Sequence, residues 1–291
     1  MKRLNVSEGL AAAMLVASMA AIMFGFGTLP STGDIVLKNA GTAYVLIVGG
    51  ICRDPDELVT QQESLEALRG LVVDNLSVPP NGLTFLAPSS PAGASSPDSP
   101  TAEHVKAAIA TIAAKAQPKD IFIFWYKGQA NVVQDTLRIN LDGPDMTHEE
   151  LAKALSSVKS HTAIIVLDCP GAGLAVKSLT GQGRIIMCGA RGDQPYATSF
   201  TQYFVPAITD PKSDFDSNGA VSILEAYRRA VTTIDDLYLD KGQLKTEIPL
   251  LEDDGDGVPT QEPWQADEET YDGPLAARVY IAGPPKSEGK Q

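Results

Sequence analysis

Basic residues are few in this sequence. Its 291 residues include 23 lysines and arginines but 36 aspartates and glutamates, so the formal net charge is -13 at pH 7. A surface of this sign repels the phosphate backbone of nucleic acids, and no basic stretch is interleaved with aromatic residues. The composition therefore argues against a nucleic-acid partner. Hydrophobic residues, at 44%, are ample for a folded core.

Cysteine and histidine are also scarce, with three residues of each. The cysteines, Cys52, Cys169 and Cys188, are too few for a disulfide framework, and none pairs with another at the spacing of a metal site. They allow one disulfide at most. Chemistry that needs a thiolate beside an imidazole therefore depends on how these few residues come together in the fold.

The first thirty residues differ from the rest of the chain. Residues 9–29 form a run of 21 residues without a charge, which as a helix spans about 30 Å of hydrocarbon. Lys2 and Arg3 precede this run, so the remainder of the chain should lie outside the cytoplasm. We predict an uncleaved, single-pass membrane anchor at residues 1–30. A cleaved signal peptide with secretion, or a buried soluble helix, are the alternatives, although no A-x-A cleavage site is evident.

Short apolar runs alternate with segments of helical periodicity after the anchor. This alternation predicts a doubly wound α/β layer sandwich with a mostly parallel central sheet, whose ligand cleft lies at the carboxyl ends of the strands. The expected strands are residues 43–50, 83–87, 120–126, 161–168 and 184–190, and the expected helices are residues 57–73, 102–116, 151–158 and 224–237. We assign this domain to residues 42–250, with a flexible loop at 88–100 and an acidic, partly ordered tail at 251–291.

Two helix starts carry recognisable signals. Ser99 can cap the helix of residues 102–116, with Pro100 at its first position. Thr147 and Glu150 have the spacing of a capping box.

The three thiols should meet at one edge of the sheet. Cys52 follows the first expected strand, Cys169 follows the fourth, and Cys188 lies near the end of the fifth. Two histidines, His104 and His148, fall in the first turns of helices, and His161 opens a strand at the opposite edge. We therefore expect the histidines to be solvated or capping residues that do not activate a thiol.

Several segments together resemble a known protease family. These are YKGQA and LDCPGAG at two strand ends, and then CGARGDQPYATSFTQYFV, SDFDSNGAVSILEAYRRA and LKTEIPLLEDDGDG. Over residues 44–257 the chain resembles the bacterial legumain-like (peptidase C13) branch of the caspase-like clan of cysteine proteases. The resemblance implies a caspase-like three-layer α/β/α sandwich. It also implies a catalytic histidine after the third strand and a catalytic cysteine after the fourth.

The chain departs from this family at the catalytic positions. The match places Gln129 where the family has histidine, Pro170 where it has the nucleophile, and Cys169 one position earlier. Ala130, Ala172 and Ile248 replace a glycine, a serine and a histidine of many relatives. Glutamine cannot accept a proton at neutral pH, and proline has neither a side-chain nucleophile nor an N–H group.

The resemblance therefore predicts an inactive protease homologue that binds a peptide or protein partner in its cleft. The alternative is an active C13-like endopeptidase that uses Cys169 as its nucleophile, with Lys127 stabilising the thiolate. Two arguments weigh against the alternative. A one-residue shift at a strand end turns a side chain to the opposite face, and Asp168 should raise the pKa of the thiol.

A calcium-loop pattern, independent of the family, occupies residues 214–225. The sequence DFDSNGAVSILE fits the EF-hand-like form D-x-[DN]-x-[DN]-G-x5-E. The candidate ligands are Asp214, Asp216, Asn218, the carbonyl of Ala220, Ser222 and Glu225. We predict Ca²⁺ as a structural brace, and a calcium-free turn held by Asx hydrogen bonds is the alternative. The sequence EDDGDGVP, from Glu252, begins similarly, but Pro263 falls where the closing glutamate should be, so we interpret it as an acidic turn.

Overall fold

The computed structural model describes residues 34–37, 40–52, 54–76, 78–79, 81–88, 98–265 and 272–281. The predicted anchor at residues 9–29 and positions 89–97 of the predicted loop lie outside these residues. Within the part of the chain that is described, no helix combines the length and the apolar character needed to cross a membrane.

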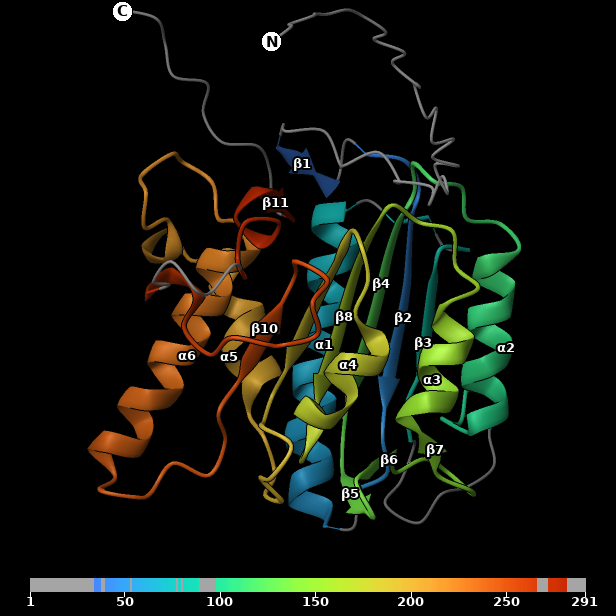
Figure 1. Cartoon of the computed structure of the whole chain (residues 1–291), viewed down its shortest axis with the longest axis horizontal. Coiled ribbons are helices and arrows are strands. Elements are labelled where there is room, and N and C mark those ends of the chain that lie inside the picture. The colour runs from blue at the N-terminus through green and yellow to red at the C-terminus, as the bar shows by residue number, and fades with distance from the viewer. Residues whose placement is uncertain are drawn as a thin grey trace, which may run out of the picture. The chain divides into compact units, whose positions relative to one another are not determined.

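A six-stranded, mostly parallel sheet forms the centre of the fold (Figure 1). Its strand order is β10-β9-β8-β4-β2-β3, and only β10 runs antiparallel to its neighbour. The strands are β2 (Ala43–Gly49), β3 (Leu83–Leu86), β4 (Ile121–Lys127), β8 (Thr162–Asp168), β9 (Arg184–Cys188) and β10 (Leu250–Glu252). The parallel strands confirm the five that the apolar runs predict.

Helices cover both faces of this sheet, which gives an α/β sandwich. On one face lie α1 (Pro55–Leu76), α5 (Phe200–Ala207) and α6 (Ile223–Asp240). On the other lie α2 (Ala102–Ala113), α3 (His148–Leu155) and the short α4 (Val176–Leu179), which follows the 3₁₀ turn η2 (Ala172–Ala175). Both faces of the sheet are therefore buried, as expected for parallel strands with nearly continuous apolar sequences.

Side chains along the central strands point alternately to the two faces of the sheet, so each strand contributes to a hydrophobic core on either face. In β4, Phe124 packs on the α2 side, whereas Trp125 packs on the α5 side. Both side chains are buried, and the indole Nε1 of Trp125 donates a hydrogen bond to Thr201 Oγ1 at 2.9 Å. This bond satisfies the one polar atom that burial of the indole would otherwise leave without a partner.

The helix starts confirm one capping prediction and correct another. Thr147 and Glu150 form the predicted capping box of α3. The N-cap of α2 is Thr101 and not Ser99, because the Thr101 hydroxyl is the group that accepts from the backbone N–H of His104, at 3.1 Å. Pro100 consequently precedes the cap and is not the first helical residue.

Small sheets that the sequence did not predict complete the described structure. An antiparallel sheet of β5 (Ala130–Val133), β6 (Thr136–Ile139) and β7 (Met146–Thr147) follows β4 at the carboxyl edge. β1 (Ile35–Val36) pairs in parallel with β11 (Val279–Tyr280), which follows the 3₁₀ turn η5 (Ala276–Arg278) (Figure 1). Two further 3₁₀ turns are η3 (Pro211–Ser213) and η4 (Pro263–Gln265).

The C-terminal segment contributes to the core of the α/β domain. Leu251 of β10, Val279 of β11 and Ile281 are buried in the same cluster as α5 and α6. The domain therefore extends past the boundary at residue 250 that the sequence predicts.

Candidate functional site

A cavity of about 280 Å³ lies at the carboxyl end of β4, on the α1–α5 side of the sheet. Its lining is Glu57, Thr60, Gln61, Lys127, Gly128, Gln129, Ala197, Thr198, Ser199 and Gln202. A cavity of about 340 Å³ lies at the opposite edge, and one of about 650 Å³ borders the segment that is not described. We place the candidate site in the cavity beside β4, because ligands of open parallel sheets bind at the carboxyl ends of the strands.

Lys127 and Asp168 form a buried ion pair beside this cavity. They end β4 and β8 at paired positions of the sheet, and Lys127 Nζ lies 3.0 Å from Asp168 Oδ2. The ammonium also donates to the carbonyl of Thr198 at 3.1 Å, and the carboxylate accepts from the N–H of Thr201 at 2.8 Å. Burial acts to raise the pKa of Asp168, but Lys127 and the donors of the α5 segment prevail and lower it.

Gln129 lies half-buried in the cavity, where the resemblance places a histidine. Its side-chain amide donates to Glu57 Oε1, and its backbone carbonyl accepts from the Tyr126 hydroxyl at 2.6 Å. A side-chain amide neither gains nor loses a proton at neutral pH. The residue can therefore position a ligand by hydrogen bonds, but it cannot serve as a general base.

Cys169 lies away from the cavity. Along β8, Val166 packs on the α5 side, and Leu167 and Cys169 pack on the α2–α3 side with the Cys169 side chain fully buried. Burial above all raises the pKa of its thiol, and Cys188 and Asp168 raise it further. Lys127 opposes this shift only in part, since its ammonium is paired with Asp168.

The other two cysteines are also buried and free. Cys52 donates to Gln61 Oε1, and burial raises the pKa of its thiol to about 12, with the Glu57 carboxylate adding to the shift. Cys188 donates to the carbonyl of Ala172 at 3.5 Å, and burial raises its pKa as well. The single disulfide that the sequence allowed is not formed, and none of the three thiols is primed for ionisation.

Two of the three histidines hydrogen-bond to the backbone through their rings. His104 bonds through Nδ1 to the carbonyl of Ser99 at 2.8 Å, and His161 is exposed just before β8, at its amino end. His148 departs from the expected solvated or capping role. It is buried and contacts the backbone of Leu137 in β6, because that strand packs over the first turn of α3.

Two carboxylates near the cavity were not predicted from the sequence. Glu57, in the first turn of α1, holds the Gln129 amide, and Glu247 accepts from both the N–H and the hydroxyl of Ser199 at 2.6 Å. Burial raises the pKa of Glu247 despite these hydrogen bonds. The sequence offers no local signal for either contact, since the partners are separated by 72 and 48 positions.

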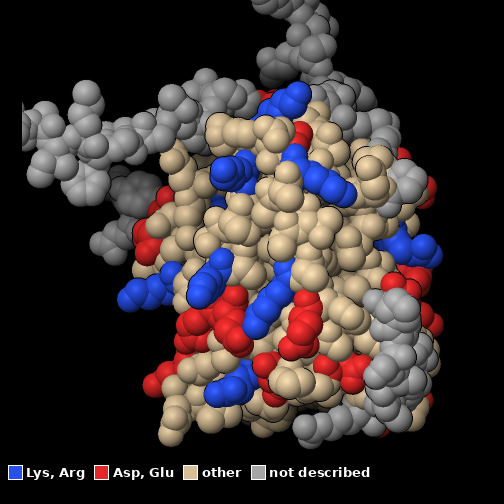
Figure 2. All heavy atoms as spheres, turned by 90° about the vertical axis from the view of Figure 1, so that its right-hand side faces the viewer, with Lys and Arg blue, Asp and Glu red and all other residues tan. Residues whose placement is uncertain are grey.

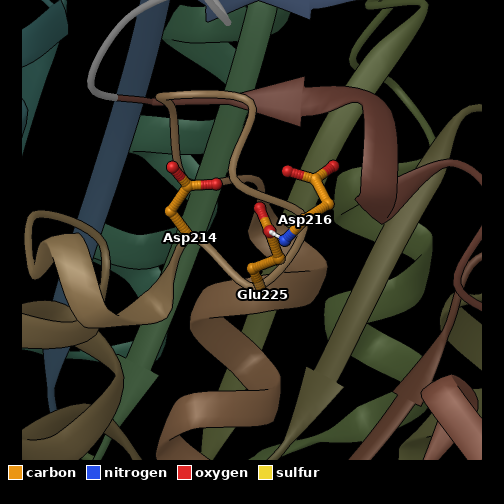
Figure 3. Close-up of side chains that lie close together, drawn as sticks. All are labelled: Asp214, Asp216 and Glu225. Atoms are coloured by element: carbon orange, nitrogen blue, oxygen red, sulfur yellow. Dashed lines mark hydrogen bonds between the residues drawn. The ribbon is translucent and has the colours of Figure 1, made fainter.

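The predicted calcium loop brings its three carboxylates together at the start of α6. Carboxylate oxygens of Asp214, Asp216 and Glu225 lie within 4.8 Å of one another. Figure 3 shows the two aspartates on either side of Glu225, whose carboxylate points from the helix into the loop. Pro206 lies inside α5, and η3 follows, so one short 3₁₀ turn precedes the loop in place of a full entering helix.

Hydrogen bonds inside the loop use all three carboxylates. Asp214 accepts from the N–H groups of Asn218 and Gly219, and Asp216 accepts from Asn218. Glu225 accepts from Phe215 at 2.9 Å and from Asp216 at 3.3 Å through Oε1, and from Ser222 through Oε2. Asn218 Oδ1 in turn accepts from Ala220 N, and Ser222 is the N-cap of α6.

The bonds that Asp214, Asp216 and Asn218 accept from backbone N–H groups are Asx hydrogen bonds of the kind that a calcium-free turn uses. They also leave room for an ion at the two aspartates, because each oxygen of Asp214 and Asp216 accepts only one hydrogen bond, whereas both Glu225 oxygens already accept two.

The surface over α2 carries charges of both signs. Figure 2 shows lysine and arginine side chains interspersed with aspartates and glutamates on this face, without a continuous basic band across it. Lys106 of α2, for example, pairs with Glu150 of α3 at 2.9 Å.

No protein-family model matches the sequence, and no curated protein matches it either.

Proposed function

We propose that the protein is an inactive, caspase-like homologue of the legumain-like (C13) proteases that binds an extended peptide segment of a partner protein. Residues 9–29 would anchor it in the membrane with the α/β domain outside the cytoplasm. Calcium at residues 214–225 would brace the start of α6. The mostly parallel sandwich agrees with the fold that the resemblance implies.

One observation carries the proposal. The cavity at the carboxyl end of β4 contains Gln129 and Lys127, whereas Cys169 is fully buried on the other side of the sheet. A base and a nucleophile that face the same space are the minimum for a cysteine protease. Among the described residues, this cavity is lined by neither a histidine nor a cysteine.

The chemistry of the cavity suits a peptide backbone. Its lining combines hydroxyls of Thr60, Thr198 and Ser199 with side-chain amides of Gln129 and Gln202, while the buried Gln61 amide is already bonded within the protein. Such groups both donate and accept hydrogen bonds, as the N–H and C=O groups of an extended peptide require. Glu57 and Lys127 add one charge of each sign, and Tyr196, which precedes the lining residue Ala197, is 59% exposed and offers an apolar contact.

Peptide binding to matched variants tests the proposal. Peptides selected on the full-length protein from a random library should lose binding when Gln129→Arg fills the cavity. They should retain binding to Ser156→Arg, which places the same charge at the cavity of the opposite edge. Equal binding to both variants would place the peptide elsewhere.

The same preparation tests the alternative of an active endopeptidase. A peptidyl electrophile applied between about pH 6 and pH 8 should not label Cys169, and no peptide should be cleaved, because the thiol is buried and its pKa is raised. Turnover that disappears in Cys169→Ala would contradict the proposal.

Membrane fractionation tests the anchor. Membranes washed with alkaline carbonate should retain the protein, whereas a soluble form that begins near Ser31 would identify a cleaved signal.

A further inference from the structure

A second acidic loop follows β10, the antiparallel strand at the edge of the sheet. Glu252 ends that strand, and Asp254 and Asp256 follow it at alternate positions. Carboxylate oxygens of these three residues lie within 4.8 Å of one another. None of these residues belongs to the cavity beside β4 or to the loop at residues 214–225.

The Glu252 carboxylate is only half satisfied. The residue is fully buried, and its Oε1 accepts hydrogen bonds from Thr180 Oγ1 at 2.5 Å, from Gly255 N at 2.8 Å and from Gly257 N at 3.3 Å. Its other oxygen, Oε2, is buried and has no hydrogen-bond partner among the described residues. A buried, charged oxygen without a partner is costly, so native structures nearly always provide it with a donor or a cation.

Among the described residues, the Glu252 carboxylate has no ion-pair partner. Burial lowers the pKa of Arg184, and the negative charge of Glu252 partly offsets this shift. The Arg184 guanidinium, however, donates its hydrogen bond to the carbonyl of Leu179 at 2.6 Å. Asp254 and Asp256 are exposed, so they add negative charge at a place that solvent ions reach.

The loop is held in shape without an ion. Asp254 accepts from the N–H of Asp256 at 2.9 Å, and Asp256 accepts from the N–H of Val258 at 2.6 Å. Gly257, at a φ of 78°, adopts a left-handed turn that favours glycine. Leu251 and Thr260 exchange hydrogen bonds of 2.9 and 2.8 Å across the base of the loop.

We propose that this loop binds a calcium ion through Glu252, Asp254 and Asp256. The ion would supply the missing partner of Glu252 Oε2 and neutralise the two exposed carboxylates. Calcium fits better than magnesium, because it accepts irregular sets of oxygen ligands together with water, whereas magnesium demands a near-ideal octahedron. The ion would join the edge strand β10 to the loop that leads to the C-terminal segment. The inference does not depend on the proposed function or on calcium at residues 214–225.

The number of bound calcium ions tests this site. Full-length protein, freed of metal by chelation and dialysed against radioactive calcium at about 10⁻³ M, should bind two ions per chain if both loops are sites. The double variant Asp254→Asn, Asp256→Asn should lose one of them. Asparagine keeps the Oδ1 acceptors of the loop, so the variant should fold, and its melting temperature in chelator should match that of the wild type.

A matched variant separates the two loops. Glu225→Gln should remove only the ion at residues 214–225, so the ion at Glu252 should remain. If wild type binds a single ion that Asp254→Asn, Asp256→Asn abolishes and Glu225→Gln retains, the second loop alone is a site, and the inference stands. An unchanged count in the Asp254→Asn, Asp256→Asn variant would overturn the inference. Equal occupancy by magnesium at the same concentration would overturn the assignment to calcium.

Discussion

The two acidic loops have similar sequences but satisfy their carboxylates differently. At residues 214–225, every carboxylate oxygen of Asp214, Asp216 and Glu225 accepts a hydrogen bond from within the loop. At residues 252–260, one oxygen of the buried Glu252 has no partner in the described structure. The first loop matches the calcium pattern and satisfies its carboxylates with its own donors, whereas the second breaks the pattern at Pro263 and leaves one buried oxygen without a donor.

This difference teaches that a motif and an electrostatic need for an ion are separate properties. A motif records which residue types occur at which spacing. The need for a cation depends on whether the fold has already supplied hydrogen-bond donors to the buried oxygens. Substitutions that remove one oxygen or one charge from each loop can therefore separate the two properties.

The largest effect should come from Glu225→Ala. In chelator we expect it to lower the free energy of unfolding by about 3 kcal/mol, because it leaves the N–H groups of Phe215 and Ser222 without their charged acceptor. Ser222→Ala, which removes only the N-cap hydroxyl of α6, should lower it by about 1 kcal/mol. Urea unfolding measures both values. Equal losses would mean that Glu225 acts only through the capping box.

In the second loop, removal of the glutamate charge should stabilise the protein. In chelator, Glu252→Gln should raise the free energy of unfolding by about 1 kcal/mol, since it removes a buried charge but keeps the acceptor for Thr180 and Gly255. In calcium the same variant should lose the part of the gain in melting temperature that the ion at the second loop contributes. Glu225→Gln is the matched control, and it should not be stabilising in either condition. A destabilising Glu252→Gln in chelator would contradict the comparison.

The smallest expected effect is a pH dependence of stability caused by Asp272, which lies near the second loop. Asp272 is buried and accepts from the N–H of Asp253 at 3.0 Å. Burial chiefly raises its pKa from 3.8 to about 6, and the charges of Asp253 and Asp254 add to the shift. Because the folded pKa exceeds the unfolded value, the stabilisation by the protonated carboxyl is complete below about pH 4 and is lost as the pH rises through about 6.

Asp272→Asn should remove this pH dependence. Relative to wild type, the variant should gain about 1 kcal/mol of unfolding free energy between pH 4 and pH 7, a value reduced for partial solvent screening. Urea unfolding at several pH values in chelator measures the difference, with the exposed Glu66→Gln as control. Parallel profiles for wild type and Asp272→Asn would show that the carboxyl titrates normally.

Local sequence patterns predicted the main elements well. The predicted strand at residues 120–126 is apolar after Asp120, and β4 follows it closely, because burial on both faces requires such a run. β5 and β6 were not predicted because each has only four residues, which is too short for a periodic pattern to stand out in the sequence. Gln134 and Asp135, which both have a positive φ, form the two-residue turn between them, and this pair lacks the glycine or asparagine that usually marks such a turn.

The candidate site was predicted only in part. Parallel strands bring their carboxyl ends to one edge, so Lys127 and Gln129 were expected to lie near the turn after β8. Asp168, at the end of β8, pairs with Lys127 as this arrangement allows, whereas the partner of Gln129 is Glu57 of α1. The contact with Glu57 depends on how α1 packs on the sheet, and no spacing in the sequence encodes that packing.

By itself, the sequence determined the alternation of strands and helices, the absence of a histidine after β4, and the residue types in both acidic loops. Each of these follows from local chemistry, namely apolar periodicity and the identity of side chains at known spacings. Only the tertiary structure decided that Cys169 faces the α2–α3 core and that Glu252 is buried. Burial is set by contacts between distant segments, and the Glu252 carboxylate meets Thr180, 72 residues earlier in the chain, only after β10 has joined the sheet.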